Sequence, residues 1–177
     1  QNKRKFKFGR VDISFSVPEI TGVWPALWMM PEKSVYGNWP RSGEIDIVET
    51  INEKSDELVT TIHYGFDYHR QISKTTFLNQ LTKLSNPIDH NKISLIWEEK
   101  YFEWLLNDQL VFKVNFDEVE NLTHNPFLEE FYLLVNVAVG GNWPGPPNST
   151  MYCNSRKSCP DVKKLIVDYI AYYEKIN

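Results

Sequence analysis

The sequence predicts an all-β fold, an antiparallel sandwich of two packed sheets. Three observations carry this prediction: many short apolar stretches of alternating polarity, little helical periodicity, and turn-forming residues between the stretches. The 177 residues are enough to bury a real core. No internal repeat and no domain boundary is visible, so we expect a single domain over residues 1–177.

Four strands are expected in the first half of the chain. Residues 6–17 alternate between polar and apolar side chains, which is typical of a half-buried strand. A second, more apolar strand is expected over residues 23–30, and a loop with proline, glycine and aromatic residues follows over 31–42. Two further strands are expected over residues 44–51 and 58–64.

The second half of the chain is expected to begin with a meander. Its three strands cover residues 92–97, 101–106 and 109–115, and Asn107-Asp108 forms a tight turn between the last two. The remaining expected elements are a short helix within 116–125, a buried strand over 131–139, a long loop over 140–160 and a final strand over 163–173.

Composition narrows the class of partner. The formal charge of −4 argues against a nucleic-acid partner, because such a partner requires a basic surface. No apolar run approaches the length of a membrane span, and no charged-then-apolar leader opens the chain, so we expect no membrane partner. Separately, we expect the protein to be a monomer. The 6 Trp, 9 Tyr and 10 Phe residues suit either core packing or stacking on sugars, and composition does not separate these two roles.

The two cysteines, Cys153 and Cys159, lie in a stretch rich in Asn, Ser, Lys and Pro. Glycosylation sequons begin at Asn121 and Asn148. A small disulfide loop together with two sequons predicts a secreted, extracellular glycoprotein. The alternative is a cytosolic protein with two free thiols. A zinc site is not expected, because no second Cys or His pair lies at ligand spacing.

Glu44, Asp46 and Glu49 crowd one expected strand. On a helix, turns of about 100° per residue would scatter the three acids around the cylinder. On a strand, Glu44 and Asp46 share a face while the intervening isoleucines point to the core. Glu49 has the wrong parity for a regular strand, but a β-bulge near Val48 would return it to the acidic face.

The spacing of the outer two acids suits glycoside hydrolysis. A bulged strand places the Cα atoms of Glu44 and Glu49 about 14–16 Å apart. Side chains that lean together bring the carboxyls to about 5–6 Å, close to the roughly 5–5.5 Å of retaining glycosidases. Asp46 lies between them and couples their titrations, so at least one acid is held protonated near neutral pH, as a general acid requires. The alternative is three solvated acids on an edge strand.

Six segments resemble glycoside hydrolase family 16, specifically its laminarinase branch: residues 8–10, 22–31, 38–49, 61–65, 135–145 and 167–172. The resemblance implies a β-jelly-roll (concanavalin A-like) with an open cleft. It implies Glu44 as the nucleophile, Glu49 as the acid/base and Asp46 as the assisting carboxylate. The six-residue motif resembles the bulged subgroup of laminarinases, agarases and carrageenases, and residues 140–145 favour β-1,3-glucans over galactans.

The resemblance also implies substrate-binding residues around the acids, namely Trp24, Trp39, Arg41, His63, Asn142 and Trp143. Trp39 would stack on the sugar beside the cleaved bond. The alternative for the tryptophans is core packing, which we prefer for Trp28 on its apolar strand. Asp168 matches an aspartate that binds a structural calcium in many members, whereas catalysis requires no cofactor. Family domains carry additional strands before residue 8, so the resemblance implies an N-terminally incomplete domain.

The expected function is therefore that of a retaining endo-β-1,3-glucanase. Its polysaccharide substrate would be a β-1,3-glucan or a mixed β-1,3/1,4-glucan, cleaved by double displacement. The alternative is a non-catalytic β-1,3-glucan recognition protein of innate immunity, which keeps the fold but lacks the acids. The presence of all three acids favours the enzyme. A third alternative is an inactive fragment or a structural subunit of a larger assembly.

Overall fold

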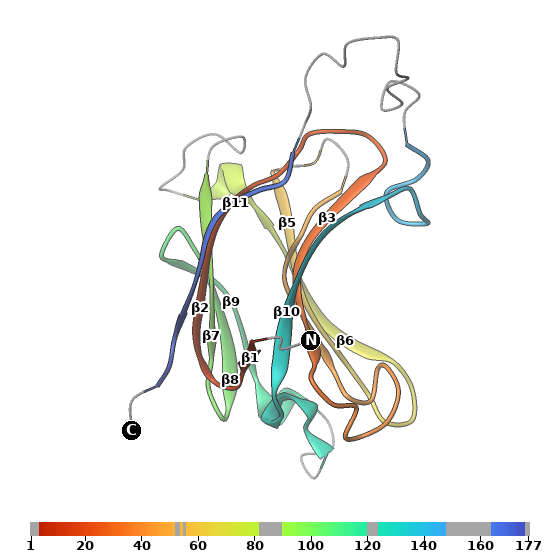
Figure 1. Cartoon of the computed structure of the whole chain (residues 1–177), viewed down its shortest axis with the longest axis vertical. Coiled ribbons are helices and arrows are strands. Elements are labelled where there is room, and N and C mark those ends of the chain that lie inside the picture. Colours follow the sequence, from red (N-terminus) through yellow and green to blue (C-terminus); the bar gives the residue numbers. More distant parts are fainter. Residues whose placement is uncertain are drawn as a thin grey trace.

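The computed structural model describes residues 4–51, 54, 56–81, 90–119, 124–147 and 164–175. Its strands form two antiparallel sheets that face each other in a β-jelly-roll sandwich, as predicted (Figure 1). The six-stranded sheet has the order β1 (Lys5–Phe6), β10 (Phe131–Val139), β3 (Val23–Pro31), β4 (Glu44–Glu49), β5 (Glu57–Tyr64) and β6 (Arg70–Phe77). The five-stranded sheet has the order β11 (Ile166–Tyr173), β2 (Gly9–Ser16), β7 (Asn91–Trp97), β8 (Tyr101–Leu106) and β9 (Gln109–Asn115).

The structure departs from the expected elements in two places. The first expected strand is divided into β1 and β2, because Phe8 and Gly9 adopt positive φ angles of 60° and 93°. Strand β6 was not expected at all. It is an edge strand whose side chains are mostly exposed or half-buried, so no alternation of polarity marks it in the sequence. The short helix expected within residues 116–125 is present as a 3-10 turn at Phe116–Glu118, and a second such turn follows at Pro126–Leu128.

The core lies between the two sheets and is rich in aromatic residues. Trp97 and Trp104 are fully buried there, whereas Trp24 and Trp28 of β3 lie on the outer face of the six-stranded sheet. The indole of Trp97 donates a hydrogen bond to the carbonyl of Phe127 at 3.0 Å, so its buried N–H is satisfied. In Figure 1 the five-stranded sheet lies on the left and the six-stranded sheet on the right, and the face of the six-stranded sheet that points away from the other sheet is called its outer face. This outer face carries the candidate site.

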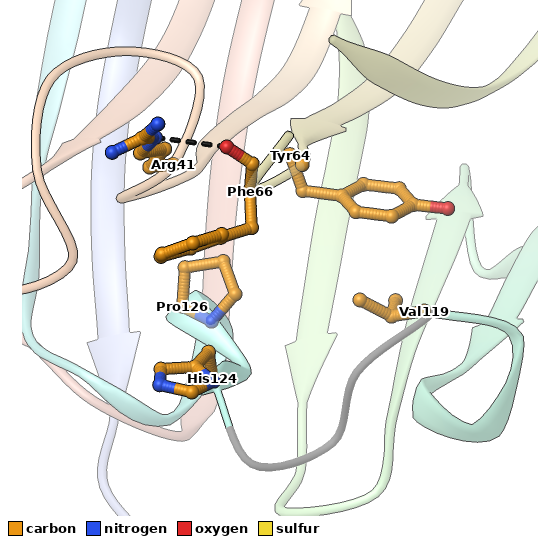
Figure 2. A pocket seen from close by; sticks show the side chains of 7 residues that line it. Arg41, Tyr64, Phe66, Val119, His124 and Pro126 are labelled. Atoms are coloured by element: carbon orange, nitrogen blue, oxygen red, sulfur yellow. Dashed lines mark hydrogen bonds between the residues drawn. The ribbon is translucent and has the colours of Figure 1, made fainter. Parts of the chain in front are cut away.

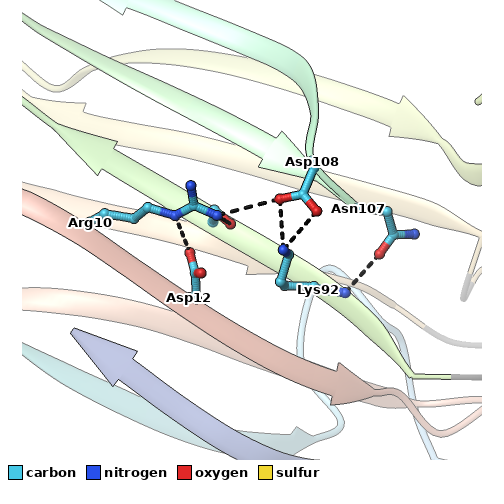
Figure 3. A network of polar contacts seen from close by, with 6 residues as sticks. Arg10, Asp12, Lys92, Asn107 and Asp108 are labelled. Carbon is cyan, nitrogen blue, oxygen red and sulfur yellow. Dashed lines mark hydrogen bonds and ion pairs between the residues drawn. The ribbon is translucent and has the colours of Figure 1, made fainter. Parts of the chain in front are cut away.

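A polar network covers the outer face of the five-stranded sheet (Figure 3). Arg10 Nε donates to Oδ1 of the buried Asp12 at 2.6 Å, and Lys92 Nζ pairs with Asp108 at 2.6 Å. Asp108 also lies 3.4 Å from the Arg10 guanidinium, so the network joins β2, β7 and the turn between β8 and β9. Asn107 and Asp108 of that turn have φ angles of 49° and 65°, which confirms the predicted tight turn.

One edge of the sandwich exposes apolar side chains. Strand β1 pairs only with Phe131 and Tyr132, and no other described strand pairs with this edge of β10. Val135 and Val137 share the core-facing side of β10, since Val135 lies opposite the buried Leu27, yet they are 43% and 37% exposed. Among the described residues, no helix has the length and apolarity needed to cross a membrane.

Candidate active site

A β-bulge in β4 gathers the three acids. Asp46 and Val48 pair with consecutive residues of β3, so that Ile47 is the extra residue. The bulge allows Ile47 and Val48 to be buried together, and Glu49 returns to the outer face with Glu44 and Asp46. The prediction of a bulge near Val48 is therefore confirmed. The three acids do not form a solvated patch, because Asp46 and Glu49 are only 2% and 9% exposed.

The acids line an open pocket of about 200 Å³ on the outer face of the six-stranded sheet. Three neighbouring strands build this pocket, and the residues contributed by β3 and β10 are Trp24, Ala26, Trp28, Asn136 and Ala138. Trp28 lies opposite Asp46 in the sheet register, and its Nε1 donates to Asn136 Oδ1 at 2.7 Å. The expectation that Trp28 packs in the core is wrong. Nearly every residue of β3 is apolar, so the sequence does not reveal which of its faces is buried.

Each outer acid accepts a hydrogen bond from an indole. Trp39 Nε1 donates to Glu44 Oε2 at 2.7 Å, and Trp24 Nε1 donates to Glu49 Oε1 at 2.8 Å. Trp39 is 50% exposed and belongs to the β3–β4 loop, so much of its ring remains open to solvent. These contacts place both predicted tryptophans beside the acids. They also separate the environments of the two outer carboxyls, because strand β3 supplies the donor to Glu49 and the β3–β4 loop supplies the donor to Glu44.

The central acid faces a histidine. His63 of β5 lies opposite Glu44 in the sheet register, and its Nε2 is 3.1 Å from Asp46 Oδ2. This distance suits an ion pair, although the direction of approach lies outside hydrogen-bond geometry. The other ring nitrogen, Nδ1, is 2.8 Å from Nε2 of His69. His63 is thus at the acid cluster, as predicted.

All three carboxyls have raised pKa values. Burial raises the pKa of Glu44 to about 7, and the charge of Asp46 adds to this effect. Burial likewise raises the pKa of Asp46 to about 7. Glu49 has the highest pKa, about 8, because burial and then the charge of Asp46 oppose its ionisation more than the Trp24 hydrogen bond favours it. Glu49 is therefore the carboxyl that retains its proton most readily near neutral pH.

Of the residues predicted in the 140–145 segment, Trp143 contacts a residue that lines the pocket, but neither it nor Asn142 lines the pocket itself. Trp143 is 41% exposed, and its ring packs edge-to-face against Trp24 with the centroids 5.0 Å apart. Asn142 is exposed in the same loop, three residues after the end of β10. This loop places Trp143 beside the Glu49 end of the pocket, whereas Trp39 lies at the Glu44 end.

Arg41 is held by a neighbouring loop (Figure 2). Its Nε donates to the carbonyl of Phe66 at 2.8 Å, and its guanidinium lies over the Phe66 ring at 4.6 Å. Below this pair, the Phe66 ring packs near His124, with the centroids 5.5 Å apart. Arg41 is not among the residues that line the acid pocket. In this structure it joins the β3–β4 loop to the β5–β6 loop.

No metal is assigned to the acid pocket. Glu44, Asp46 and His63 form the group of described residues whose ligand atoms lie close together, within 4.8 Å of one another. Their oxygens and nitrogen already contact one another and Trp39, so an ion at this position would have to displace these contacts.

Asp168 does not by itself fit the calcium site expected of it. Its Oδ2 accepts a hydrogen bond from Ser14 Oγ at 3.0 Å and lies 2.7 Å from His90 Nδ1. Among the described residues, Asp168 belongs to no group of three or more clustered His, Cys, Asp or Glu residues. The expected disulfide between Cys153 and Cys159 lies outside the described residues, as do the sequons at Asn121 and Asn148.

Sequence reasoning missed two residues of the site. Asn136 orients the indole of Trp28, and His69 contacts both His63 and Trp39. Asn136 lies opposite Ala26 of β3 on the pocket face, so the pairing of β10 with β3 would have identified it. His69 occupies a turn of irregular structure, where no periodicity indicates the direction of a side chain.

Known proteins resemble this chain over most of its length. Glucan endo-1,3-beta-glucosidase A1 of Niallia circulans is 34% identical over 99% of the chain, which covers 25% of that relative. Beta-1,3-glucan-binding protein of Penaeus monodon is 31% identical over 77% of the chain and 43% of that relative. The crystal structure of the laminarinase catalytic domain from Thermotoga maritima MSB8 superposes with a TM-score of 0.82 and 30% identity, covering 98% of this chain and 66% of that one.

The chain spans a quarter to about half of the length of the first curated relatives. The pattern of the glycosyl hydrolases family 16 matches residues 1–155, which include the bulged strand with its three acids. The two-sheet sandwich agrees with this match. The chain belongs to glycosyl hydrolases family 16 and is laminarinase-like.

Proposed function

We propose that the chain is the catalytic part of a retaining endo-β-1,3-glucanase that acts on β-1,3- or mixed β-1,3/1,4-glucans. The observation that carries the proposal is the pair Glu44 and Glu49 on one face of a bulged strand, with Glu49 the more strongly protonated. Relatives with glucan endo-1,3-beta-glucosidase activity in their names support the choice of substrate.

In the first step, the Glu44 carboxylate attacks the anomeric carbon of the sugar. The bond to the glycosidic oxygen breaks, and Glu49 gives its proton to that oxygen as the leaving chain departs. A covalent ester between Glu44 and the sugar results. Trp39 stabilises the charged form of Glu44 before the attack, because its N–H lowers the carboxyl pKa.

In the second step, the Glu49 carboxylate takes a proton from a water molecule that attacks the anomeric carbon. The ester bond breaks, Glu44 leaves as a carboxylate, and Glu49 is protonated again. Two inversions give net retention of configuration. The charge of Asp46 raises the pKa of Glu49 and thereby helps it to recover the proton. The steps are balanced without a cofactor.

The half-exposed indoles of Trp39 and Trp143 are proposed to stack on sugar rings on either side of the acids. A non-catalytic glucan-binding protein is the second candidate, favoured by the similarity to the Penaeus monodon protein. We further propose that the protein is secreted and acts as a monomer, with a Cys153–Cys159 disulfide and glycans on Asn121 and Asn148. Mass measurement before and after reduction and deglycosylation tests these modifications.

The main test is the release of reducing ends from laminarin, with the anomeric configuration of the first product followed by ¹H NMR. We expect β-configured new ends from the unaltered chain and none from Glu44→Gln, whereas Trp143→Phe should reduce turnover only modestly. An inert chain that still binds laminarin would support the binding protein. First products of α configuration would contradict the retaining mechanism.

A further inference from the structure

His69 lies at the rim of the pocket and contacts two partners of the acids. Its Nε2 is 2.8 Å from Nδ1 of His63, and the two rings stack with their centroids 5.1 Å apart. The His69 ring also lies beside the indole of Trp39, with the centroids 4.8 Å apart. His63 faces Asp46, and Trp39 donates to Glu44. One imidazole therefore contacts the partners of two carboxyls.

The contact between the two histidines requires one proton. Partial desolvation and then the neighbouring His63 lower the pKa of His69. The 2.8 Å contact is a hydrogen bond when one of the two nitrogens, His63 Nδ1 or His69 Nε2, carries the proton and the other accepts it. This bond fixes the plane of the His63 ring and keeps its Nε2 turned toward Asp46.

The turn that carries His69 is tightly constrained. Gly65 has a φ of 127°, and a Cβ at this position would lie 2.0 Å from the carbonyl oxygen of Tyr68, so the turn requires glycine. The hydrogen bond from Arg41 to the Phe66 carbonyl then joins this turn to the loop that holds Trp39. The arrangement in Figure 2 accordingly explains what Arg41 does here, because it holds the two loops together.

We propose that His69 is a positioning residue that orients His63 toward Asp46 and supports Trp39 against Glu44. The role in turnover rests on the proposed function, but the orientation of His63 does not. The competing explanations are that His69 is merely a solvated residue of an exposed turn, or that it contacts the substrate directly. Both make different predictions from the proposal.

The test uses His69→Phe, which keeps a ring beside Trp39 but removes both ring nitrogens, and His69→Gln, which keeps a group that can donate or accept without a ring. Asp67→Asn, in the same exposed turn, is the control. In imidazole ¹H–¹⁵N spectra, the His63 Nδ1 resonance should keep its position in His69→Gln and in Asp67→Asn, but should move in His69→Phe, because that nitrogen loses its hydrogen-bond partner. On laminarin, kcat should fall about tenfold in His69→Phe with KM nearly unchanged, and should partly recover in His69→Gln.

Two results would overturn the proposal. An unchanged His63 Nδ1 resonance in His69→Phe would show that His69 does not hold His63. A rise in KM with unchanged kcat would show that His69 contacts the substrate instead. An unaltered chain that is inert on laminarin contradicts the proposed function alone, since the spectra still decide the positioning role. If His69→Phe does not fold, His69→Ala removes the ring nitrogens in its place.

Discussion

The indole Nε1 of Trp39 donates a 2.7 Å hydrogen bond to Oε2 of Glu44, the proposed nucleophile. The donor belongs to a loop, whereas the acceptor is the first residue of β4. Because an N–H donor stabilises the carboxylate more than the neutral acid, this contact lowers the pKa of Glu44 against the effect of burial. A half-exposed indole thus also tunes the pKa of Glu44.

Replacing Trp39 by Phe should move the acidic limb of the pH–activity profile to higher pH. Without the N–H, the pKa of Glu44 rises further, so the nucleophile ionises only at higher pH. A hydrogen bond to a charged group contributes about 1.5–3 kcal/mol, which corresponds to a shift of about one pH unit or more. The measurement is kcat/KM on laminarin between pH 4 and 10. Trp143→Phe is the control, because it also replaces an exposed indole, but one that packs against Trp24 and not beside Glu44. An unmoved acidic limb in Trp39→Phe would contradict the assignment of Glu44.

Replacing Trp24 by Phe should act on the other limb. Trp24 donates to Glu49 at 2.8 Å and lowers its pKa, so loss of the donor raises that pKa above about 8. Glu49 then keeps its proton at higher pH, and the alkaline limb moves upward by about one unit. The same pH series measures this shift. A limb that moves downward, or a shift of the acidic limb instead, would show that Glu49 is not the general acid.

The sequence predicted the acid cluster well, because the alternation of side chains along a strand determines which acids share a face. Only a bulge places Glu49 on the face of Glu44 and Asp46, and Ile47 is indeed the extra residue. Trp28 was misplaced, because β3 is apolar on both faces and the sequence contains no signal for the side that carries the pocket. Similarly, β6 lacks an apolar face, and its pairing with β5 is made by the backbone. The face that Trp28 occupies depends on β10, which is distant in the sequence, whereas β6 is held by its hairpin with β5 and leaves no pattern in its own side chains.

Asp46→Asn should change how stability depends on pH. Burial raises the pKa of Asp46 from its model-peptide range to about 7, so between about pH 4 and pH 7 the folded chain binds more protons than the unfolded chain. The free energy of unfolding therefore falls as pH rises through this window, and the stabilising effect of the neutral acid is fully present only below it. An asparagine at position 46 does not ionise, so it contributes no such fall in the free energy of unfolding. We expect the two proteins to be similar at pH 4 and the variant to be more stable at pH 8.5 by on the order of 1–3 kcal/mol.

Denaturant unfolding at both pH values measures the difference. Glu103→Gln is the control. Glu103 forms an ion pair with Lys113 at 2.8 Å, and both residues belong to the five-stranded sheet, whereas Asp46 belongs to the six-stranded sheet. It should leave the slope between pH 4 and 8.5 almost unchanged. Equal pH dependence in Asp46→Asn and the unaltered chain would show that Asp46 ionises normally in the folded state.

Gly43→Ala should damage both stability and activity, because Gly43 precedes Glu44 and has a φ of 82°. A Cβ there would lie 3.0 Å from Pro126 Cβ and 3.2 Å from the rings of Phe127 and Phe131, which are fixed in the core. Gly145→Ala is a matched control with a φ of 77° and no atom within 4 Å of its Cβ. Both variants bear the strain of a left-handed alanine, about 1–2 kcal/mol, but only Gly43→Ala adds crowding, for a total of about 2–4 kcal/mol. Thermal unfolding and laminarin turnover of the two variants measure the difference, and equal losses would show that crowding beneath Glu44 does not position the nucleophile.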